Sequence, residues 1–442
     1  MTKSVKYTTA NGRVAAPASK SVAQRAVVAA LLARGTSVLR NLTLCSDTQA
    51  ALGVAQALGA QVRQQEGSLL ITSNFFANSA ERLSLFCGES GLLTRMITPV
   101  AALLPQPVEV SGHGSLATRP IGMVEAPLRD LGATVATTGG LLPLRVQGRL
   151  RGGTASIDGS LSSQLLTGLL MALPLALHPS TLHVHSLKSR PYVDLTVALL
   201  KAFGVSVAHD ERYEVFRIGG QQRYAPCSYS VEGDWSGASC LLVAGAIAGR
   251  VTVENLSLAS PQADREMLTA LKRAGAQVCI EACGGNGNGS SDGGSSNGNG
   301  GDVRSAVTVS QSPLSAFTFD ATDCPDLFPA LAVLASCCDG VSVVKGASRL
   351  THKESNRALA LQKEFGALGV AIALRGDEML ITGGSITGGS VHSHGDHRMA
   401  MALATAALRA SGEVTIEQAE SVEKSYPGFW RDLDRLGEGS AR

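Results

Sequence analysis

The stretch SKSVAQRAVVAALLARG, Ser19–Gly35, has the pattern of a helix that is buried on nearly all sides. Lys20, Ser21 and Arg25 lie in its first turns, and the residues that follow are almost all Ala, Val and Leu. A helix that is apolar all round packs inside a protein. Its first turn offers unpaired N–H groups and the positive end of the helix dipole, so with two cations added it is a candidate cradle for a phosphate or carboxylate. Gly35 is the expected stop of the helix. Taken alone, the stretch also fits a capped core helix with two surface cations.

Five further stretches repeat this pattern of a polar first turn and an apolar body. They begin near Glu89, Ser162, Asp234, Pro325 and Asp396. Between the markers Lys20, Ser90, Ser162, Trp235, Asp326 and His397 the steps are 70, 72, 73, 91 and 71 residues.

A second series of signals runs in phase with the first. Glycines that follow an apolar residue have the pattern of helix ends. They are Gly59, Gly132, Gly204, Gly275, Gly369 and Gly437, with steps of 73, 72, 71, 94 and 68 residues. Two signals with one period indicate six repeats of about 72 residues, each with one buried helix, one helix that ends at a glycine and several short strands.

One long step has a simple cause. Residues 284–301, GGNGNGSSDGGSSNGNGG, consist of Gly, Asn, Ser and one Asp, a composition that cannot bury a core. Removing these 18 residues shortens the 91-residue step to 73 and restores the period. The stretch is therefore expected to be a flexible insertion.

Bulk composition limits the class of protein. A chain of 442 residues exceeds the usual size of a single core, so six repeats suggest two domains of three. With 38 basic and 36 acidic residues, the net charge of +2 argues against a general nucleic-acid or membrane surface as partner. Nine scattered cysteines without zinc-ligand spacing, and a start without an apolar targeting core, favour reduced thiols and a cytoplasmic location.

Polar residues gather where helices of the first half are expected to begin. Gly88–Gly91 allows close approach of the backbone to a ligand. Arg119 precedes Pro120, where a helix is expected to begin with Pro at N1. Taken alone, Arg119 is typical of solvated surface. Ser162, Ser163 and Gln164 supply more neutral donors than one helix cap needs. Ser46 and Asp47 are expected to cap a second helix.

The second half carries the densest charge. Asp326 stands at the start of one buried helix, and Lys424 precedes the last helix. In Lys353–Arg357, Glu354 and Arg357 are spaced to lie on one helix face, where an isolated pair is usually a surface ion pair. His397 and Arg398 open the sixth buried helix, and burying such charges without a ligand costs several kcal/mol each. If the helix starts face one way in each half, two opposed halves enclose a positive cleft suited to two anionic substrates.

The ordered motifs of the chain resemble those of one enzyme family. They are PASKSVAQRA, GESGLLTR, RPIG, DGSLSSQLLTGLLMALPLA, SRPYVDLT, VEGDWSGAS, CPDLFPALAVLA, HKESNRA, GDHRMAMALA and EKSYPGF. They are similar, over nearly the whole chain, to the 3-phosphoshikimate 1-carboxyvinyltransferase (enolpyruvylshikimate phosphate synthase) family. The resemblance implies a two-domain inside-out α/β barrel with three βαβαββ repeats per domain around buried parallel helices. It assigns residues 1–16 and 230–442 to one domain and 17–229 to the other, with the active site in the cleft between them.

The resemblance also implies a reaction and roles for residues. The enolpyruvyl group of phosphoenolpyruvate passes to the 5-hydroxyl of shikimate 3-phosphate by addition and elimination through a tetrahedral intermediate, without a metal or other cofactor. The residues implied to bind shikimate 3-phosphate are Ser21, Arg25, Ser162, Ser163, Gln164, Ser189, Asp326 and Lys353. Those implied to bind phosphoenolpyruvate are Lys20, Gly91, Arg119, Gln164, Arg357, Arg398 and Lys424. Asp326, Glu354 and Lys20 are the implied catalytic residues, Asp326 taking the hydroxyl proton and Glu354 moving a proton at the methylene carbon. A monomer is expected.

Five positions depart from the family pattern. Leu92 stands where Thr is usual, Glu89 where Asn is usual, Arg349 where some members have Asn, Asn356 where Asp is usual and Gly428 where an acidic residue is usual. None of these departures removes a charged catalytic group, so activity is expected.

Three other functions stay open at this level: a related enolpyruvyl transferase, a repeat scaffold and an RNA-phosphate-binding relative. The related enolpyruvyl transferases that act on UDP-N-acetylglucosamine typically have a Cys in the loop before their Arg-Pro pair, whereas the loop His113–Thr118 has none. A repeat scaffold would not need charged residues at helix starts. An RNA-phosphate-binding relative should be more basic than +2.

Overall fold

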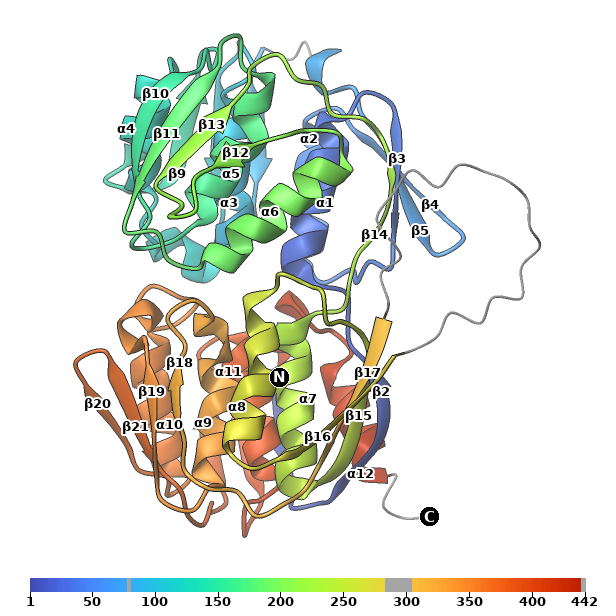
Figure 1. Cartoon of the computed structure of the whole chain (residues 1–442), viewed down its shortest axis with the longest axis vertical. Coiled ribbons are helices and arrows are strands. Elements are labelled where there is room, and N and C mark those ends of the chain that lie inside the picture. Colours follow the sequence, from blue (N-terminus) through green and yellow to red (C-terminus); the bar gives the residue numbers. More distant parts are fainter. Residues whose placement is uncertain (78–80, 283–303, 439–442) are drawn as a thin grey trace. The chain divides into compact units, whose positions relative to one another are not determined.

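The computed structural model describes residues 1–77, 81–282 and 304–438, which divide into two compact units (Figure 1). The continuous unit is Lys20–Val231, and the discontinuous unit joins Met1–Ser19 to the described residues from Glu232 onward. The insertion expected at 284–301 lies outside the described residues. In the three described ranges, no helix combines the length and the apolar character that crossing a membrane requires.

The continuous unit alternates helices with short strands. Its helices are α1 (Lys20–Leu32), α2 (Ser46–Ala57), α3 (Gly91–Ala101), α4 (Glu125–Asp130), α5 (Gln164–Ala172) and α6 (Arg190–Ala202). Its strands are β3 (Thr36–Arg40), β4 (Gln61–Gln65), β5 (Ser68–Thr72), β6 (Leu83–Phe86), β7 (Val108–Ser111), β8 (Thr134–Thr138), β9 (Leu141–Gln147), β10 (Gly153–Asp158), β11 (Ser180–His185), β12 (Ala208–His209), β13 (Val215–Ile218) and β14 (Ser228–Ser230).

The discontinuous unit has the same alternation. Its helices are α7 (Trp235–Ala248), α8 (Met267–Arg273), α9 (Phe328–Ser336), α10 (Arg357–Ala367), α11 (His397–Ala407) and α12 (Phe429–Glu438). Its strands are β1 (Thr2–Val5), β2 (Ala10–Ala15), β15 (Gly249–Ser257), β16 (Gln277–Ala282), β17 (Arg304–Ser310), β18 (Thr318–Asp320), β19 (Val341–Lys345), β20 (Ile372–Arg375), β21 (Glu378–Thr382), β22 (Gly389–His392) and β23 (Val414–Glu417). The fold is thus mixed α/β, as predicted.

Five of the six sheets in the described residues have four strands in one shared pattern, and the sixth has three strands. Their orders are β14-β3-β5-β4, β6-β7-β9-β8, β10-β11-β13-β12, β16-β17-β15-β2, β18-β19-β21-β20 and β1-β23-β22. In β6-β7-β9-β8, the parallel strands β6 and β7 are joined through α3, and β9 runs antiparallel to both of its neighbours. Two sheets take their outer parallel strand from elsewhere in the chain, since β14 pairs with β3 and β2 pairs with β15.

The apolar stretches that repeat in the sequence form the centre of each unit. Every residue of α7, α9 and α11 is buried, and these three helices contact one another (Figure 1). In the continuous unit α3 contacts both α1 and α5. The prediction of buried helices is therefore confirmed, although α1 ends at Leu32, before the expected stop at Gly35.

The glycine series marks helix ends at five of its six positions. Gly59, Gly132, Gly204, Gly275 and Gly369 all have positive φ angles. The N–H of the residue after each glycine donates to a carbonyl five residues back, as from Ala60 to Ala55 at 2.9 Å. The prediction for Gly437 is wrong, because α12 continues to Glu438.

Candidate active site

Lys20 begins α1 and lies against the start of α2. Its Nζ is 3.1 Å from Oδ2 of Asp47, and both side chains are mostly buried. The cap expected at Ser46 or Asp47 is wrong, because Cys45 occupies the N-cap position of α2. Asp47 instead holds Lys20 at the start of the buried helix.

Arg25 is a buried cation whose described partners are all neutral. It is 1% exposed and donates from Nε to Thr196 Oγ1 (2.9 Å), from Nη2 to Thr167 Oγ1 (3.3 Å) and from Nη1 to the Ser21 carbonyl (2.8 Å). Burial lowers the pKa of Arg25 to about 10, so it is charged at neutral pH. Among the described residues no carboxylate pairs with Arg25, which makes this position suited to an anionic ligand.

Gly91 begins α3 beneath two arginines. A Cβ at Gly91 would lie 2.8 Å from Arg95 Nη1 and 2.9 Å from Arg119 Nη1. The preceding residue, Ser90, caps α3 by accepting a hydrogen bond from the Leu93 N–H at 3.3 Å. The absence of a side chain at Gly91 therefore lets two guanidinium groups approach the start of the helix.

Arg95 joins three positions that the sequence singled out separately. This buried side chain donates from Nη1 to the Gly91 carbonyl (3.3 Å) and to Gln164 Oε1 (3.0 Å). Its Nη2 donates to the Pro120 carbonyl at 2.6 Å. Sequence reasoning did not assign Arg95 to the site, although an arginine in the second turn of an otherwise apolar helix was a usable signal.

The segment after Arg119 differs from the expected structure. No helix begins at Pro120, because the N–H groups of Ile121 and Gly122 donate to the Gly140 carbonyl at 2.8 and 3.1 Å. A 3₁₀ turn, Gly122–Val124, follows, and α4 begins only at Glu125. Arg119 itself is 8% exposed, so its interpretation as solvated surface is also wrong.

The departure at Glu89 has a structural role in this region. Glu89 Oε2 accepts hydrogen bonds from the Ser115 N–H (3.0 Å) and hydroxyl (3.1 Å). Gly114 has a φ of +59°, and a Cβ there would overlap the Glu89 carboxylate. Glu89 thus anchors the loop that leads to Arg119.

The predicted serines lie at two helix starts. Ser162 Oγ accepts from the Gln164 N–H at 3.1 Å, and the Ser163 carbonyl accepts from Thr167 N–H at 3.0 Å. Ser189 precedes α6 with a left-handed φ of +57°. In the described part of the chain, the hydrogen bonds of Ser162 and Ser163 go to the α5 backbone and none reaches Arg25.

Asp326 is the centre of a second charged group, in the discontinuous unit. It lies in the 3₁₀ turn Pro325–Leu327 that leads into α9. Its Oδ1 is 3.1 Å from Lys353 Nζ and 2.9 Å from Arg357 Nη1, and its Oδ2 is 3.2 Å from Arg398 Nη2. Burial raises the pKa of Asp326, but the charges of Arg398, Lys353 and Arg357 outweigh burial and hold that pKa well below its usual value.

Arg357 binds two further carboxylates. Its Nη2 is 2.7 Å from Glu354 Oε2, and its Nε is 2.9 Å from Asp396 Oδ2. Glu354 precedes α10, so the expected arrangement on one helix face is wrong, and with Arg357 0% exposed the surface ion pair is wrong as well. Burial lowers the pKa of Arg357, but Asp396, Glu354 and Asp326 raise it above its usual value. Sequence reasoning did not select Asp396, which also caps α11.

Asp264 is a second residue of this group that sequence reasoning missed. It lies buried in the 3₁₀ turn Ala263–Glu266 and accepts a hydrogen bond from the Ser236 hydroxyl. Burial, together with the charge of Asp326, raises the pKa of Asp264 to about 6, although Arg398 acts in the opposite direction. Asp264 and Asp326 therefore stand next to the same arginine with pKa values shifted in opposite directions.

This shift gives a testable pH dependence. Because the folded pKa of Asp264 lies above the value of about 3.9 for an unfolded aspartate, the folded protein holds an extra proton between the two values, and its stability falls as pH rises through that window. In Asp264→Asn the free energy of unfolding should therefore rise relative to wild type by roughly 3 kcal/mol from pH about 4 to about 6. Urea titrations across this range measure the difference. If the free energies of unfolding of wild type and Asp264→Asn changed with pH in parallel, a raised pKa of Asp264 would be contradicted. The control is Asp434→Asn, which removes the charge of an exposed ion pair with Lys3.

Lys424 lies at the end of a 3₁₀ segment that follows β23. Its Nζ donates to the Gly395 carbonyl at 2.7 Å, next to Asp396. The cations Lys353, Arg357, Arg398 and Lys424 thus share their surroundings with the carboxylates Asp326, Glu354 and Asp396. An anionic ligand can take over hydrogen bonds that these carboxylates now accept.

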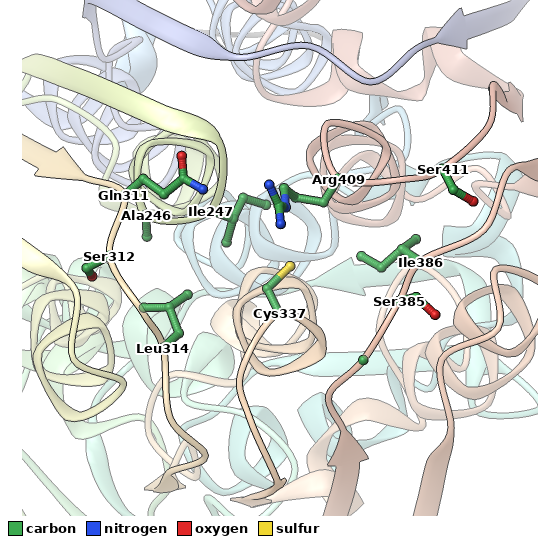
Figure 2. A pocket seen from close by; sticks show the side chains of 11 residues that line it. Ala246, Ile247, Gln311, Ser312, Leu314, Cys337, Ser385, Ile386, Arg409 and Ser411 are labelled. Carbon is green, nitrogen blue, oxygen red and sulfur yellow. The ribbon is translucent and has the colours of Figure 1, made fainter.

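The other ends of the buried helices offer different chemistry. Figure 2 shows a pocket of about 260 Å³ whose lining includes Ile247, Cys337 and Arg409, which lie at the C-terminal ends of α7, α9 and α11. Helix C-termini carry the negative end of the dipole and disfavour anions. None of the predicted site residues lines this pocket.

Comparisons with known proteins identify the family. A family model described as EPSP synthase (3-phosphoshikimate 1-carboxyvinyltransferase) matches residues 5–433. This chain belongs to the EPSP synthase family. Relatives named 3-phosphoshikimate 1-carboxyvinyltransferase include those of Aeropyrum pernix, 39% identical over 97% of this chain and 94% of the relative, and of Methanosarcina acetivorans, 37% identical over 99% and 98%. A solved EPSP synthase from Acinetobacter baumannii has a TM-score of 0.80 at 25% identity and covers 99% of this chain and 98% of that one.

The site residues that the resemblance to the EPSP synthase family implies can now be located in the two units. The predicted site residues fall into two groups, one in each unit. Lys20, Ser21, Arg25, Gly91, Arg119, Ser162, Ser163, Gln164 and Ser189 lie in the continuous unit. Asp326, Lys353, Glu354, Arg357, Arg398 and Lys424 lie in the discontinuous unit.

Proposed function

We propose that this chain transfers the enolpyruvyl group of phosphoenolpyruvate to the 5-hydroxyl of shikimate 3-phosphate and releases phosphate, a step of aromatic amino acid biosynthesis. The observation that carries the proposal is the family match over residues 5–433. Relatives at 33–39% identity bear the name of this transferase, which favours shikimate 3-phosphate over UDP-N-acetylglucosamine as acceptor. Buried and charged residues at the helix starts support a catalytic protein over a scaffold.

The shikimate 3-phosphate side of the proposed site centres on Arg25. Its charge is buried among neutral oxygens, so an incoming phosphate gains a charge-assisted hydrogen bond without displacing a carboxylate. Ser21, Ser162, Ser163, Gln164 and Ser189 would add neutral donors, while Lys353 and Asp326 would bind the rest of this substrate. This arrangement suits a monophosphate on a hydroxylated ring.

The phosphoenolpyruvate side of the proposed site uses cations from both units. Lys20 and Arg119, with Gly91 beside them, would bind this substrate together with Arg357, Arg398 and Lys424. In the described structure Asp326 accepts from Arg357 and Arg398. When the substrate's anionic groups draw these cations away, the pKa of Asp326 rises toward a value that suits a base for the 5-hydroxyl.

Proton transfers then complete the proposed reaction. The 5-hydroxyl oxygen forms a bond to C2 of phosphoenolpyruvate as its proton passes to Asp326, and Glu354 delivers a proton to the C3 methylene, which becomes a methyl group. In the tetrahedral intermediate, the bond from C2 to the phosphate oxygen breaks, and a proton leaves the methyl group to Glu354. The double bond is restored, the departing phosphate takes up the proton that Asp326 accepted from the hydroxyl, and Lys20 stabilises the charge that shifts between the oxygens.

The finer architecture is part of the proposal. We propose that each unit is an inside-out α/β barrel of three βαβαββ repeats, supported by the strand order that five of the six described sheets share and by the contacts among the buried helices. Both groups of site residues would serve one reaction. The cytoplasm is the proposed compartment, supported by the free thiols of the described cysteines. The monomeric state stays a prediction.

Product analysis tests the proposed acceptor. Purified protein is incubated with phosphoenolpyruvate and either shikimate 3-phosphate or UDP-N-acetylglucosamine, and the products are examined by mass spectrometry and ¹³C NMR. The proposal expects one enolpyruvyl ether, on the 5-oxygen of shikimate 3-phosphate. An ether formed on UDP-N-acetylglucosamine instead would overturn it.

Gly91→Ala should weaken phosphoenolpyruvate binding without unfolding the protein. The new Cβ would push against the ends of Arg95 and Arg119, which are flexible enough to shift. We expect KM for phosphoenolpyruvate to rise roughly three- to tenfold, because the guanidinium groups lose their alignment. Gly53→Ala is the matched control, since its Cβ meets nothing within 4 Å and α2 gains up to about 1 kcal/mol in helix propensity. Equal KM values in the two variants would contradict the role of Gly91.

A further inference from the structure

A carboxylate outside the proposed active site is buried on α10. Glu364 is 3% exposed and lies seven residues after Arg357 in the same helix. Seven residues are about two helical turns, so both side chains leave α10 on one face. Glu364 therefore contacts the same neighbouring structure as Arg357, farther along the helix.

Two partners of Glu364 come from the last residue of β22 and from the segment that leads from it to α11. Its Oε2 accepts from the His392 N–H at 2.9 Å, and its Oε1 is 2.7 Å from His394 Nε2. Lys363, which is exposed, approaches the same Oε1 at 3.2 Å. Burial raises the pKa of Glu364, but these hydrogen bonds outweigh burial and leave that pKa below its usual value. Glu364 is therefore an anion at neutral pH.

The same segment carries two contacts of the proposed active site. Asp396 pairs with Arg357, and the Gly395 carbonyl accepts from Lys424 at 2.7 Å. The residues just before Asp396 have left-handed backbones, with φ of +56° at His394 and +63° at Gly395. Non-glycine residues adopt this conformation infrequently, and contacts with the surrounding structure stabilise it. At His394 the contact with Glu364 stabilises the left-handed backbone.

We propose that Glu364 and His394 are positioning residues that fix the segment His392–Asp396 to α10. Through this attachment the Asp396 carboxylate stays against Arg357, and the Gly395 carbonyl stays against Lys424. The segment is thus held to α10 at two levels of the helix, by Glu364 and by Arg357. Neither Glu364 nor His394 is assigned a contact with substrate. The expected effect of this attachment on substrate KM rests on the proposed function.

A metal site is the other chemistry that two histidines and a glutamate suggest. Across the described residues, no group of three or more His, Cys, Asp or Glu side chains has an arrangement that could hold a metal ion. Within the protein, Nε2 of His394 already contacts Glu364, and Nδ1 of His392 accepts a hydrogen bond from the His394 N–H at 2.8 Å. The geometry therefore favours positioning.

The kinetic test compares KM for the two substrates. In Glu364→Ala, we expect KM for phosphoenolpyruvate to rise about tenfold and KM for shikimate 3-phosphate to change by about threefold or less, because Arg357 and Lys424 belong to the phosphoenolpyruvate side. Glu364→Gln, which can still accept from the His392 N–H, should recover part of the loss. Lys363→Ala removes the exposed partner only and should match wild type. Unchanged KM values in folded Glu364→Ala, or equal increases for both substrates, would overturn the inference.

A second measurement is independent of turnover. His394→Gly keeps the left-handed backbone available but removes the ring, so amide hydrogen exchange in residues 392–398 should increase in this variant and in Glu364→Ala. Exchange equal to wild type in both variants would overturn the inference. If wild type shows no turnover, the proposed function fails and the exchange result still decides the attachment. If wild type is active but both variants show the amide exchange of wild type, the attachment is overturned and the proposed function stands.

Discussion

Glu354→Gln is expected to give a folded protein whose turnover falls about a thousandfold, within the range for loss of a positioned acid–base group. Glutamine has nearly the shape of glutamate but cannot deliver a proton to the methylene carbon or take one back. Its side-chain carbonyl can still accept from Arg357 Nη2, which lies 2.7 Å from Glu354 Oε2 in the described structure. The loss should therefore appear in kcat more than in KM for either substrate.

The control for this variant is a glutamate in an ordinary ion pair. Glu378→Gln removes the charge of a half-exposed side chain 3.8 Å from Lys345 and should leave turnover unchanged. Circular dichroism and thermal unfolding establish that both variants are folded. Turnover of folded Glu354→Gln within about tenfold of wild type would remove Glu354 from the proton transfers.

Arg357→Met is expected to lower the free energy of unfolding by about 3–5 kcal/mol at neutral pH, the range for removing one partner of a buried ion pair. Arg357 is 0% exposed and neutralises Asp326, Glu354 and Asp396 at once. Without it, the three carboxylates remain close together with less positive charge. Activity should be lost as well, since the same guanidinium is assigned to phosphoenolpyruvate.

The destabilisation by Arg357→Met should depend on pH. In wild type the depressed pKa of Asp326 gives stability that is present above about pH 3.9, the unfolded value, and is lost as pH falls through the folded pKa. Because the pKa of Asp326 is depressed less in the variant, the stability deficit of Arg357→Met should stay constant down to about pH 4 and shrink as pH falls further, toward the folded pKa of Asp326. Urea unfolding at neutral and acidic pH measures it. Arg145→Ala at the exposed pair with Glu109 is the control, expected to cost less than about 1 kcal/mol. If Arg357→Met lowered the free energy of unfolding at neutral pH no more than Arg145→Ala does, the account would be contradicted.

Local patterns in the sequence predicted much of the secondary structure. The helix ends at Gly59 and four equivalent glycines were predictable because the chain reversal there needs a positive φ, which glycine adopts without strain. At Gly437 the same pattern failed, because α12 continues past this glycine to Glu438. At Pro120 an expected helix start failed because hydrogen bonds from Ile121 and Gly122 to the Gly140 carbonyl replace a helical turn.

The sequence predicted the positively charged residues of the candidate site better than the residues that contact them. Lys20, Arg25 and Arg398 are visible in sequence because a charge at the start of an apolar helix is unusual. Asp396 and Asp264 were missed because their roles in the site depend on residues far away in the chain. Arg95 was missed for the same reason, since its acceptors belong to α5 and to the loop after Arg119.

Besides Glu89, two departures from the family pattern have a local explanation. Asn356 caps α10, where its side chain accepts from the Leu359 N–H at 3.4 Å as an aspartate would. Arg349 donates from Nη1 to the Thr322 carbonyl at 2.9 Å. Nothing in the structure explains Leu92. These contacts support the expectation that the departures preserve activity.

Phosphate release is the most direct test of the central claim. Purified protein is given phosphoenolpyruvate alone, shikimate 3-phosphate alone, and both together, and inorganic phosphate is followed over time. The account predicts release only when both substrates are present, because the 5-hydroxyl must add to C2 before the phosphate can leave. No release with both substrates, or the same release from phosphoenolpyruvate alone, would contradict it.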